Sequence, residues 1–131
     1  MTHSCNFRVY YEDTDAGGVV YYANYLKFAE RARTELLRSF ALNQVELAAK
    51  HNMLFVVRNA ALELFKPAKL DDLLTIETEV LGLKAAVIEL EQNIYLEKLR
   101  LCNIKIKLVL INKDFRPIRL PDFLKKVFSK V

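Results

Sequence analysis

The sequence has few of the residues on which metal sites, disulfide scaffolds and flexible linkers depend. It contains no tryptophan, two cysteines, two histidines, three glycines and three prolines in 131 residues. Cys5, Cys102, His3 and His51 form no CxxC or Cys/His cluster, so neither a metal site nor a disulfide framework is predicted. The scarcity of glycine and proline argues against linkers and low-complexity segments. We therefore expect one domain over residues 1–131.

Long apolar runs are also missing. No stretch approaches the ~20 apolar residues that cross a bilayer, and the polar residues 1–6 lack the apolar core of a signal peptide. The basic residues do not cluster with aromatic residues as a nucleic-acid platform requires. We expect a soluble cytoplasmic protein without a transmembrane segment or a nucleic-acid partner.

Hydrophobic residues make up 53% of the chain. This fraction is high for so small a domain, and spare apolar surface commonly lies in a subunit interface. We therefore expect the chain to associate with copies of itself.

The periodicity of the apolar residues predicts an α+β fold. A helical stripe spans about residues 24–39, with Asn24 as a candidate N-cap and Arg31–Glu35 as a candidate ion pair. Its alanines favour close packing on a sheet, and a second short helix is expected over residues 44–51. Strands are predicted at residues 7–11, at 54–65, and in three later runs of alternating polarity, with a hairpin at Gly82. A short helix is expected within residues 122–130.

The most informative segment is the acid-rich turn before the long helix. Glu12, Asp13 and Asp15 are followed at once by Gly17 and Gly18, and glycine permits a sharp bend. A carboxylate at such a turn lies beside the free N–H groups and the positive dipole end of the helix. That arrangement can hold a polarised carbonyl opposite an acid, which acyl chemistry requires.

This segment resembles the 4-hydroxybenzoyl-CoA thioesterase family. The resemblance rests on Arg8-Val9, Thr14-Asp15, Gly18-Val19 and Tyr25-Leu26. The continuation over residues 28–35 and a second block over residues 65–73 resemble the YbgC-like branch associated with the Tol–Pal system. The resemblance implies a hot-dog fold, in which a curved antiparallel sheet of about five strands wraps around one long helix. It also implies dimers or tetramers with active sites at subunit interfaces.

Asp15 is the candidate catalytic residue, because it is the last acid before the glycine turn and the family's active-site Asp falls on it. The resemblance implies that this carboxylate either attacks the thioester or activates a water. It also implies that the Tyr22 N–H polarises the carbonyl, although many YbgC-like sequences carry His at this position. Asp15 could alternatively stabilise only the turn, and we expect Asp13 to fix the geometry of the loop.

We count Gly18, Tyr22, Tyr25 and Arg58 as candidate substrate-binding residues. Tyr25 either packs in the core or lines the pocket. Arg58 lies in an apolar strand, where a charge is costly unless it is paired. It would bind a phosphate, an acid across a subunit interface, or a surface partner. Four further cations are candidates for the phosphates of CoA: Lys66, Lys84, Lys98 and Arg100.

The sequence thus predicts an acyl-CoA thioesterase of lipid metabolism that yields a free acid and CoA. No metal or organic cofactor is expected, and the family resemblance implies a homotetramer. The net charge of +4 suits the phosphates of CoA and equally suits a plain soluble surface. The alternative function is a non-catalytic adaptor that binds acyl-CoA or an acyl carrier protein. If the protein is an enzyme, the acyl carrier protein could also carry the substrate in place of CoA. The length and type of the acyl group stay open.

Overall fold

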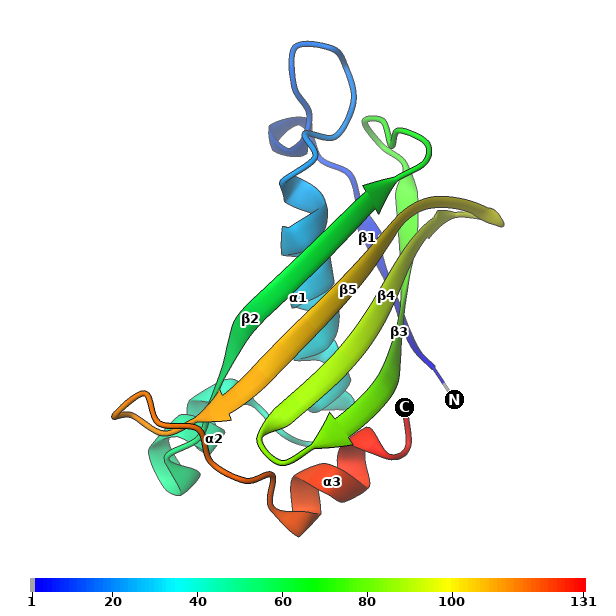
Figure 1. Cartoon of the computed structure of the whole chain (residues 1–131). Coiled ribbons are helices and arrows are strands. Elements are labelled where there is room, and N and C mark those ends of the chain that lie inside the picture. The colour runs from blue at the N-terminus through cyan, green and yellow to red at the C-terminus, as the bar shows by residue number, and fades with distance from the viewer. Residues whose placement is uncertain (1) are drawn as a thin grey trace.

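The structure, a computed structural model, describes residues 2–131 and consists of one antiparallel sheet with a long helix against one face (Figure 1). The strands follow the spatial order β1-β3-β4-β5-β2. Their bounds are β1 His3–Arg8, β2 Leu54–Leu64, β3 Leu73–Lys84, β4 Val87–Leu96 and β5 Leu99–Ile111. The helices are α1 Asn24–Ser39, α2 Gln44–His51 and α3 Asp122–Phe128, with a 3-10 turn at Tyr11–Asp13. This arrangement confirms the predicted α+β hot-dog fold.

Helix α1 follows from the spacing of its apolar residues. Six of them are buried, at three- and four-residue intervals: Tyr25, Phe28, Ala29, Ala32, Leu36 and Leu37. Ala29 and Ala32 are completely buried, and their small side chains let α1 lie close to β1, β3 and β5. The predicted helix and its packing on a sheet are therefore confirmed.

The alternating strands bury one face against α1. In β3 and β4 the buried positions recur every second residue, at Leu74, Ile76 and Thr78 and at Ile88, Leu90, Gln92 and Ile94. This pattern is typical of an antiparallel sheet with one covered face.

Among residues 2–131, no helix has both the length and the apolar character that crossing a membrane requires.

Two predictions about the start of the chain are wrong. The first strand covers His3–Arg8 and not residues 7–11, because an edge strand with one buried face needs only alternating apolar positions such as Cys5 and Phe7. Asn24 does not cap α1. Its side-chain amide instead donates to the Asp13 carbonyl at 2.9 Å, which ties the helix start to the preceding loop.

Two further predictions are corrected. Gly82 lies inside β3 at a register shift in its pairing with β4, and the hairpin turns later, at Ala85, whose φ is 55°. Glu35 forms its ion pair with Arg38 and not with Arg31. At both positions the local sequence is compatible with more than one structure. The residue or strand that lies beside the position in the folded chain decides which structure forms.

A buried polar network fastens the middle of α1 to the sheet. The Gln92 side chain, fully buried in β4, donates to the Ala29 carbonyl at 2.9 Å and to Thr78 Oγ1 at 3.0 Å. Its Oε1 accepts a hydrogen bond from Arg33 Nη1 at 3.0 Å. Burial lowers the pKa of Arg33. Gln92 therefore satisfies three polar groups that water cannot reach freely.

We predict that Gln92→Leu lowers the free energy of unfolding by about 1–3 kcal/mol, because it leaves buried polar groups without partners. Chemical denaturation measures this change. Gln44→Leu, at an exposed glutamine whose amide donates to Thr34 Oγ1 at the surface, is the matched control and should change stability by less than about 0.5 kcal/mol. Equal stability of Gln92→Leu and the wild type would contradict the proposed role of the network.

Candidate active site

The loop before α1 folds back on itself around Asp15. Thr14 and Val20 pair as an antiparallel bridge, and the Asp15 N–H donates to the Val19 carbonyl at 2.9 Å. The turn closes when the Gly18 N–H donates to the Asp15 carbonyl at 3.0 Å, with Gly18 at a φ of 79°. A left-handed φ favours glycine, so this residue type allows the tight reversal.

The side chain of Asp15 is held by the same turn. Its Oδ1 accepts a hydrogen bond from the Gly17 N–H at 2.8 Å. A Cβ at position 17 would lie 3.1 Å from this oxygen, so a glycine at this position avoids crowding the carboxylate. This is the turn-stabilising bond that an Asp commonly makes two residues on. Within residues 2–131, Oδ2 accepts no hydrogen bond, so one oxygen fixes the side chain and the other stays available.

Asp13 has a different environment. Its side chain is buried, and its carboxylate accepts the Tyr10 N–H at 2.8 Å. Its carbonyl accepts the Tyr21 N–H at 3.0 Å. The prediction that Asp13 fixes the geometry of the loop is therefore confirmed. Glu12 is exposed.

The start of α1 leaves backbone donors free beside this loop. The Asn24 N–H donates to the Tyr21 carbonyl at 2.8 Å, and the Tyr25 N–H donates to the Tyr22 carbonyl at 3.3 Å. In the part of the chain that the structure describes, the N–H groups of Tyr22 and Ala23 have no acceptor. Free N–H groups at a helix N-terminus form a positive end that attracts a developing negative charge.

Asp15 and Tyr22 line one hollow, which we call the Asp15 crevice. Its volume is about 380 Å³, and its walls are Asp15, Val19, Val20, Tyr21, Tyr22, Tyr25, Leu64, Phe65, Lys66 and Pro67. The loop and the crevice are joined to the rest of the fold by the Val20 N–H, which donates to the Ala68 carbonyl at 2.9 Å. Residues from the start of α1 and from the end of β2 therefore meet here.

Of two further predicted binding residues, Tyr25 lines the crevice and Gly18 does not. Tyr25 is 2% exposed, and its hydroxyl accepts the Ala68 N–H at 3.1 Å, so it packs in the core while it lines the floor. Burial raises the pKa of Tyr25. Gly18 lines a second hollow on the other side of the loop, and Asp15 borders both hollows.

Arg58 lies elsewhere. It is exposed at the register shift between Val57 and Asn59 in β2, and its side chain forms no ion pair or hydrogen bond with any other described residue. One chain does not bring it to the Asp15 crevice. Sequence reasoning missed Phe65 and Pro67 as crevice residues. The sequence feature that could have indicated both residues is the Lys-Pro step that ends the strand. The chain at this step lies beneath the start of α1.

The cysteines are poor candidates for a nucleophile. Burial raises the pKa of Cys5 to about 11 and that of Cys102 to about 12. Thiol chemistry depends on the thiolate, so neither side chain is activated near neutral pH. Neither cysteine lines the Asp15 crevice, whose one carboxylate is Asp15.

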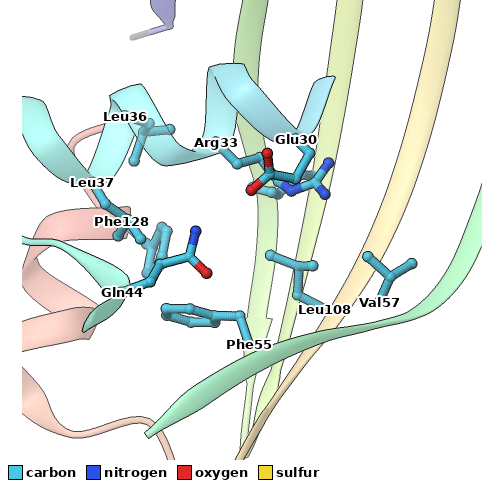
Figure 2. A pocket seen from close by; sticks show the side chains of 10 residues that line it. Glu30, Arg33, Leu36, Leu37, Gln44, Phe55, Val57, Leu108 and Phe128 are labelled. Carbon is cyan, nitrogen blue, oxygen red and sulfur yellow. The ribbon is translucent and has the colours of Figure 1, made fainter. Parts of the chain in front are cut away.

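A separate apolar hollow lies between α1 and the sheet (Figure 2), and we call it the Arg33 pocket. It measures about 140 Å³. Figure 2 shows Glu30 and Arg33 reaching from α1 toward Val57 and Leu108 on the strands. The remaining walls are mostly apolar: Leu36, Leu37, Gln44, Phe55, Leu90 and Phe128.

Comparisons with known proteins identify the family of the chain. Residues 17–103 match the family model of the thioesterase superfamily. The acyl-CoA thioesterase YbgC of Haemophilus influenzae is 45% identical over 122 residues, which cover 92% of this chain and 90% of that protein. The acyl-CoA thioesterase YbgC of Helicobacter pylori strain J99 is 38% identical over 95% of this chain and 98% of its own length. The crystal structure of a probable thioesterase from Bartonella henselae superposes with a TM-score of 0.90 at 40% identity, covering 92% of this chain and all of that one.

Proposed function

Because the chain belongs to the thioesterase superfamily, we propose that it hydrolyses an acyl-CoA thioester to a free acid and CoA. The names of its relatives support the reaction and the CoA carrier. Cytoplasmic location, a role in lipid metabolism and the use of acyl carrier protein stay predictions.

One observation carries the chemical part of the proposal: Asp15 and the open end of α1 at Tyr22 line the same crevice. A thioester carbonyl in this crevice would direct its oxygen to the Tyr22 N–H. Its carbon would face the Asp15 carboxylate. Donors fixed before the reaction stabilise the oxyanion at no cost of reorganisation.

Two routes fit this arrangement. As a nucleophile, Asp15 bonds to the carbonyl carbon, the C–S bond breaks, and water then hydrolyses the resulting anhydride. As a general base, Asp15 takes a proton from the water that attacks the same carbon. In both routes CoA leaves as a thiolate and takes up a proton, while the acyl group leaves as a carboxylic acid.

We predict that Asp15→Asn lowers kcat by about 10²–10⁴-fold, because the amide neither accepts the proton nor attacks the carbonyl. Its side-chain oxygen can still accept the Gly17 N–H, so the turn is kept. Release of free thiol from a panel of acyl-CoA esters measures the rate.

Glu12→Gln is the matched control for Asp15→Asn, since Glu12 is exposed in the same loop. It should keep wild-type turnover. Undiminished turnover in Asp15→Asn would assign the reaction to Glu12, to Asp13 or to another chemistry.

The site also requires a second copy of the chain in our proposal. β2 pairs with β5 along one edge only, and no strand within residues 2–131 pairs with its other edge. Apolar side chains on this strand are exposed, including Val56 at 39%, Val57 at 50% and Leu64 at 49%. A long apolar edge strand is prone to pair with another chain. We therefore propose a homodimer, or a tetramer built from such dimers, joined through β2.

Antiparallel pairing of two β2 edges explains how the two hollows cooperate. A twofold axis places the start of one β2 beside the end of the other. The Arg33 pocket uses Phe55 and Val57 near the start of β2, while the Asp15 crevice uses Leu64 and Phe65 at its end. The acyl group would therefore extend from the Asp15 crevice of one copy toward the Arg33 pocket of the other.

We predict that Val56→Glu converts the assembly to a 15.2 kDa monomer in sedimentation, because pairing would bury an unpaired carboxylate. The value of kcat/KM should fall at least about tenfold, since the second copy's pocket is lost. Leu81→Glu, at an exposed β3 residue far from β2 in the strand order, should keep at least a dimer. A wild-type monomer with full activity would refute the shared site.

A further inference from the structure

The end of the Asp15 crevice carries two cations that no carboxylate neutralises. Lys66 lines the crevice directly, and the Arg100 guanidinium lies over the ring of Phe65, 4.5 Å from its centroid. Phe65 is itself a wall of the crevice. Within residues 2–131 the ion pairs join Arg38 to Glu35, Lys50 to Glu46 and Lys107 to Glu89, so neither Lys66 nor Arg100 takes part in one.

The backbone holds these side chains at the mouth of the crevice. The N–H groups of Phe65 and Lys66 both donate to the Leu101 carbonyl, at 2.8 and 3.3 Å. Arg100 precedes that residue at the start of β5, and Lys66 lies just after the end of β2, so the cations come from neighbouring segments of the chain. Figure 1 places the end of β2 and the β4–β5 turn at the same end of the molecule as the loop before α1.

A guanidinium stacked by its face on an aromatic ring keeps the N–H donors of its edge free. Such an edge, with an ammonium group nearby, is a typical phosphate-binding arrangement. The exposed Phe65 and Leu99, at 39% and 50%, add an apolar surface beside the cations. This combination suits a ligand that carries both phosphates and a flat base.

We infer that Lys66 and the Phe65–Arg100 stack bind the phosphates of the CoA nucleotide and so select CoA as the thiol carrier. This inference rests on the proposed thioesterase function. A phosphopantetheine arm on a carrier protein presents a single phosphodiester, whereas CoA adds a pyrophosphate and a 3′-phosphate. Two unpaired cations match the larger number of charges on CoA.

The test compares one acyl group on three carriers: CoA, phosphopantetheine and pantetheine. Arg100→Ala and Lys66→Ala should each lower kcat/KM for acyl-CoA by about tenfold, through KM and with kcat unchanged, because each removes a charge-assisted hydrogen bond. Arg100→Ala, at a residue outside the crevice walls, should leave kcat/KM for acyl-pantetheine unaltered, because that substrate carries no phosphate. Added salt should weaken the wild type only on phosphate-bearing substrates.

Lys105→Ala is the matched control, since Lys105 is exposed on the same strand β5 outside the crevice. It should leave all three substrates unaffected. Arg100→Lys should recover part of the CoA preference, because it restores the charge without the planar stack.

Three results would overturn the inference. Arg100→Ala could lower kcat/KM equally on all three carriers, which would indicate a structural role. Arg100→Ala could leave kcat/KM for acyl-CoA unchanged. Alternatively, the loss of kcat/KM that is specific to acyl-CoA could appear in the double variant Lys125→Ala/Lys126→Ala, beside the turn after β3. In each case wild-type hydrolysis of acyl-pantetheine would continue. Failure of the proposed function itself differs, because no thioester would then be hydrolysed by the wild type.

Discussion

The short backbone reversal between β1 and α1 positions the groups of the site. It is closed by the Asp15–Val19 and Gly18–Asp15 hydrogen bonds and fixed to the body of the protein by the Val20–Ala68 bond. Because the chain turns back within these residues, a carboxylate reaches the place where α1 still has unpaired N–H groups. Neither element alone would supply the proposed chemistry. A carboxylate without the donors lacks an oxyanion site, and the donors without it lack a reactive oxygen.

The rest of the fold holds this reversal against the sheet. Ala29 and Ala32 bring α1 close to the strands, and Gln92 fixes its middle through the Ala29 carbonyl and Arg33. The end of β2 then forms the opposite wall of the Asp15 crevice. In the proposed mechanism stability and function are linked, since any shift of α1 along the sheet would move the Tyr22 N–H away from Asp15.

Patterns that depend on local sequence predicted the fold well. The apolar stripe of α1 and the alternation in β3, β4 and β5 were readable because burial on one face imposes a period on the sequence. Asp15 and the glycine turn were readable because the acids and the glycines adjoin in the chain. The catalytic role of Asp15 stays a prediction.

Features that depend on distant partners were not readable. Asn24 looked like a cap, but its amide bonds to the Asp13 carbonyl, and Gly82 looked like a turn, but it lies at a register shift in β3. The stack of Arg100 on Phe65 joins residues 35 positions apart through strand pairing. The placement of Arg58 away from the Asp15 crevice likewise follows from the register of β2 with β5. Such contacts appear only once the sheet is assembled.

The central claim is that the Tyr22 N–H and Asp15 face the two ends of one carbonyl bond. The most direct measurement is a crystal structure of the wild-type protein with a ketone analogue of acyl-CoA, in which a methylene group replaces the sulfur. We predict that the ketone oxygen lies within about 3.1 Å of the Tyr22 nitrogen, and that its carbon lies within about 3.5 Å of an Asp15 carboxylate oxygen. A ketone bound outside the Asp15 crevice, or held there with its oxygen away from the start of α1, would contradict the account.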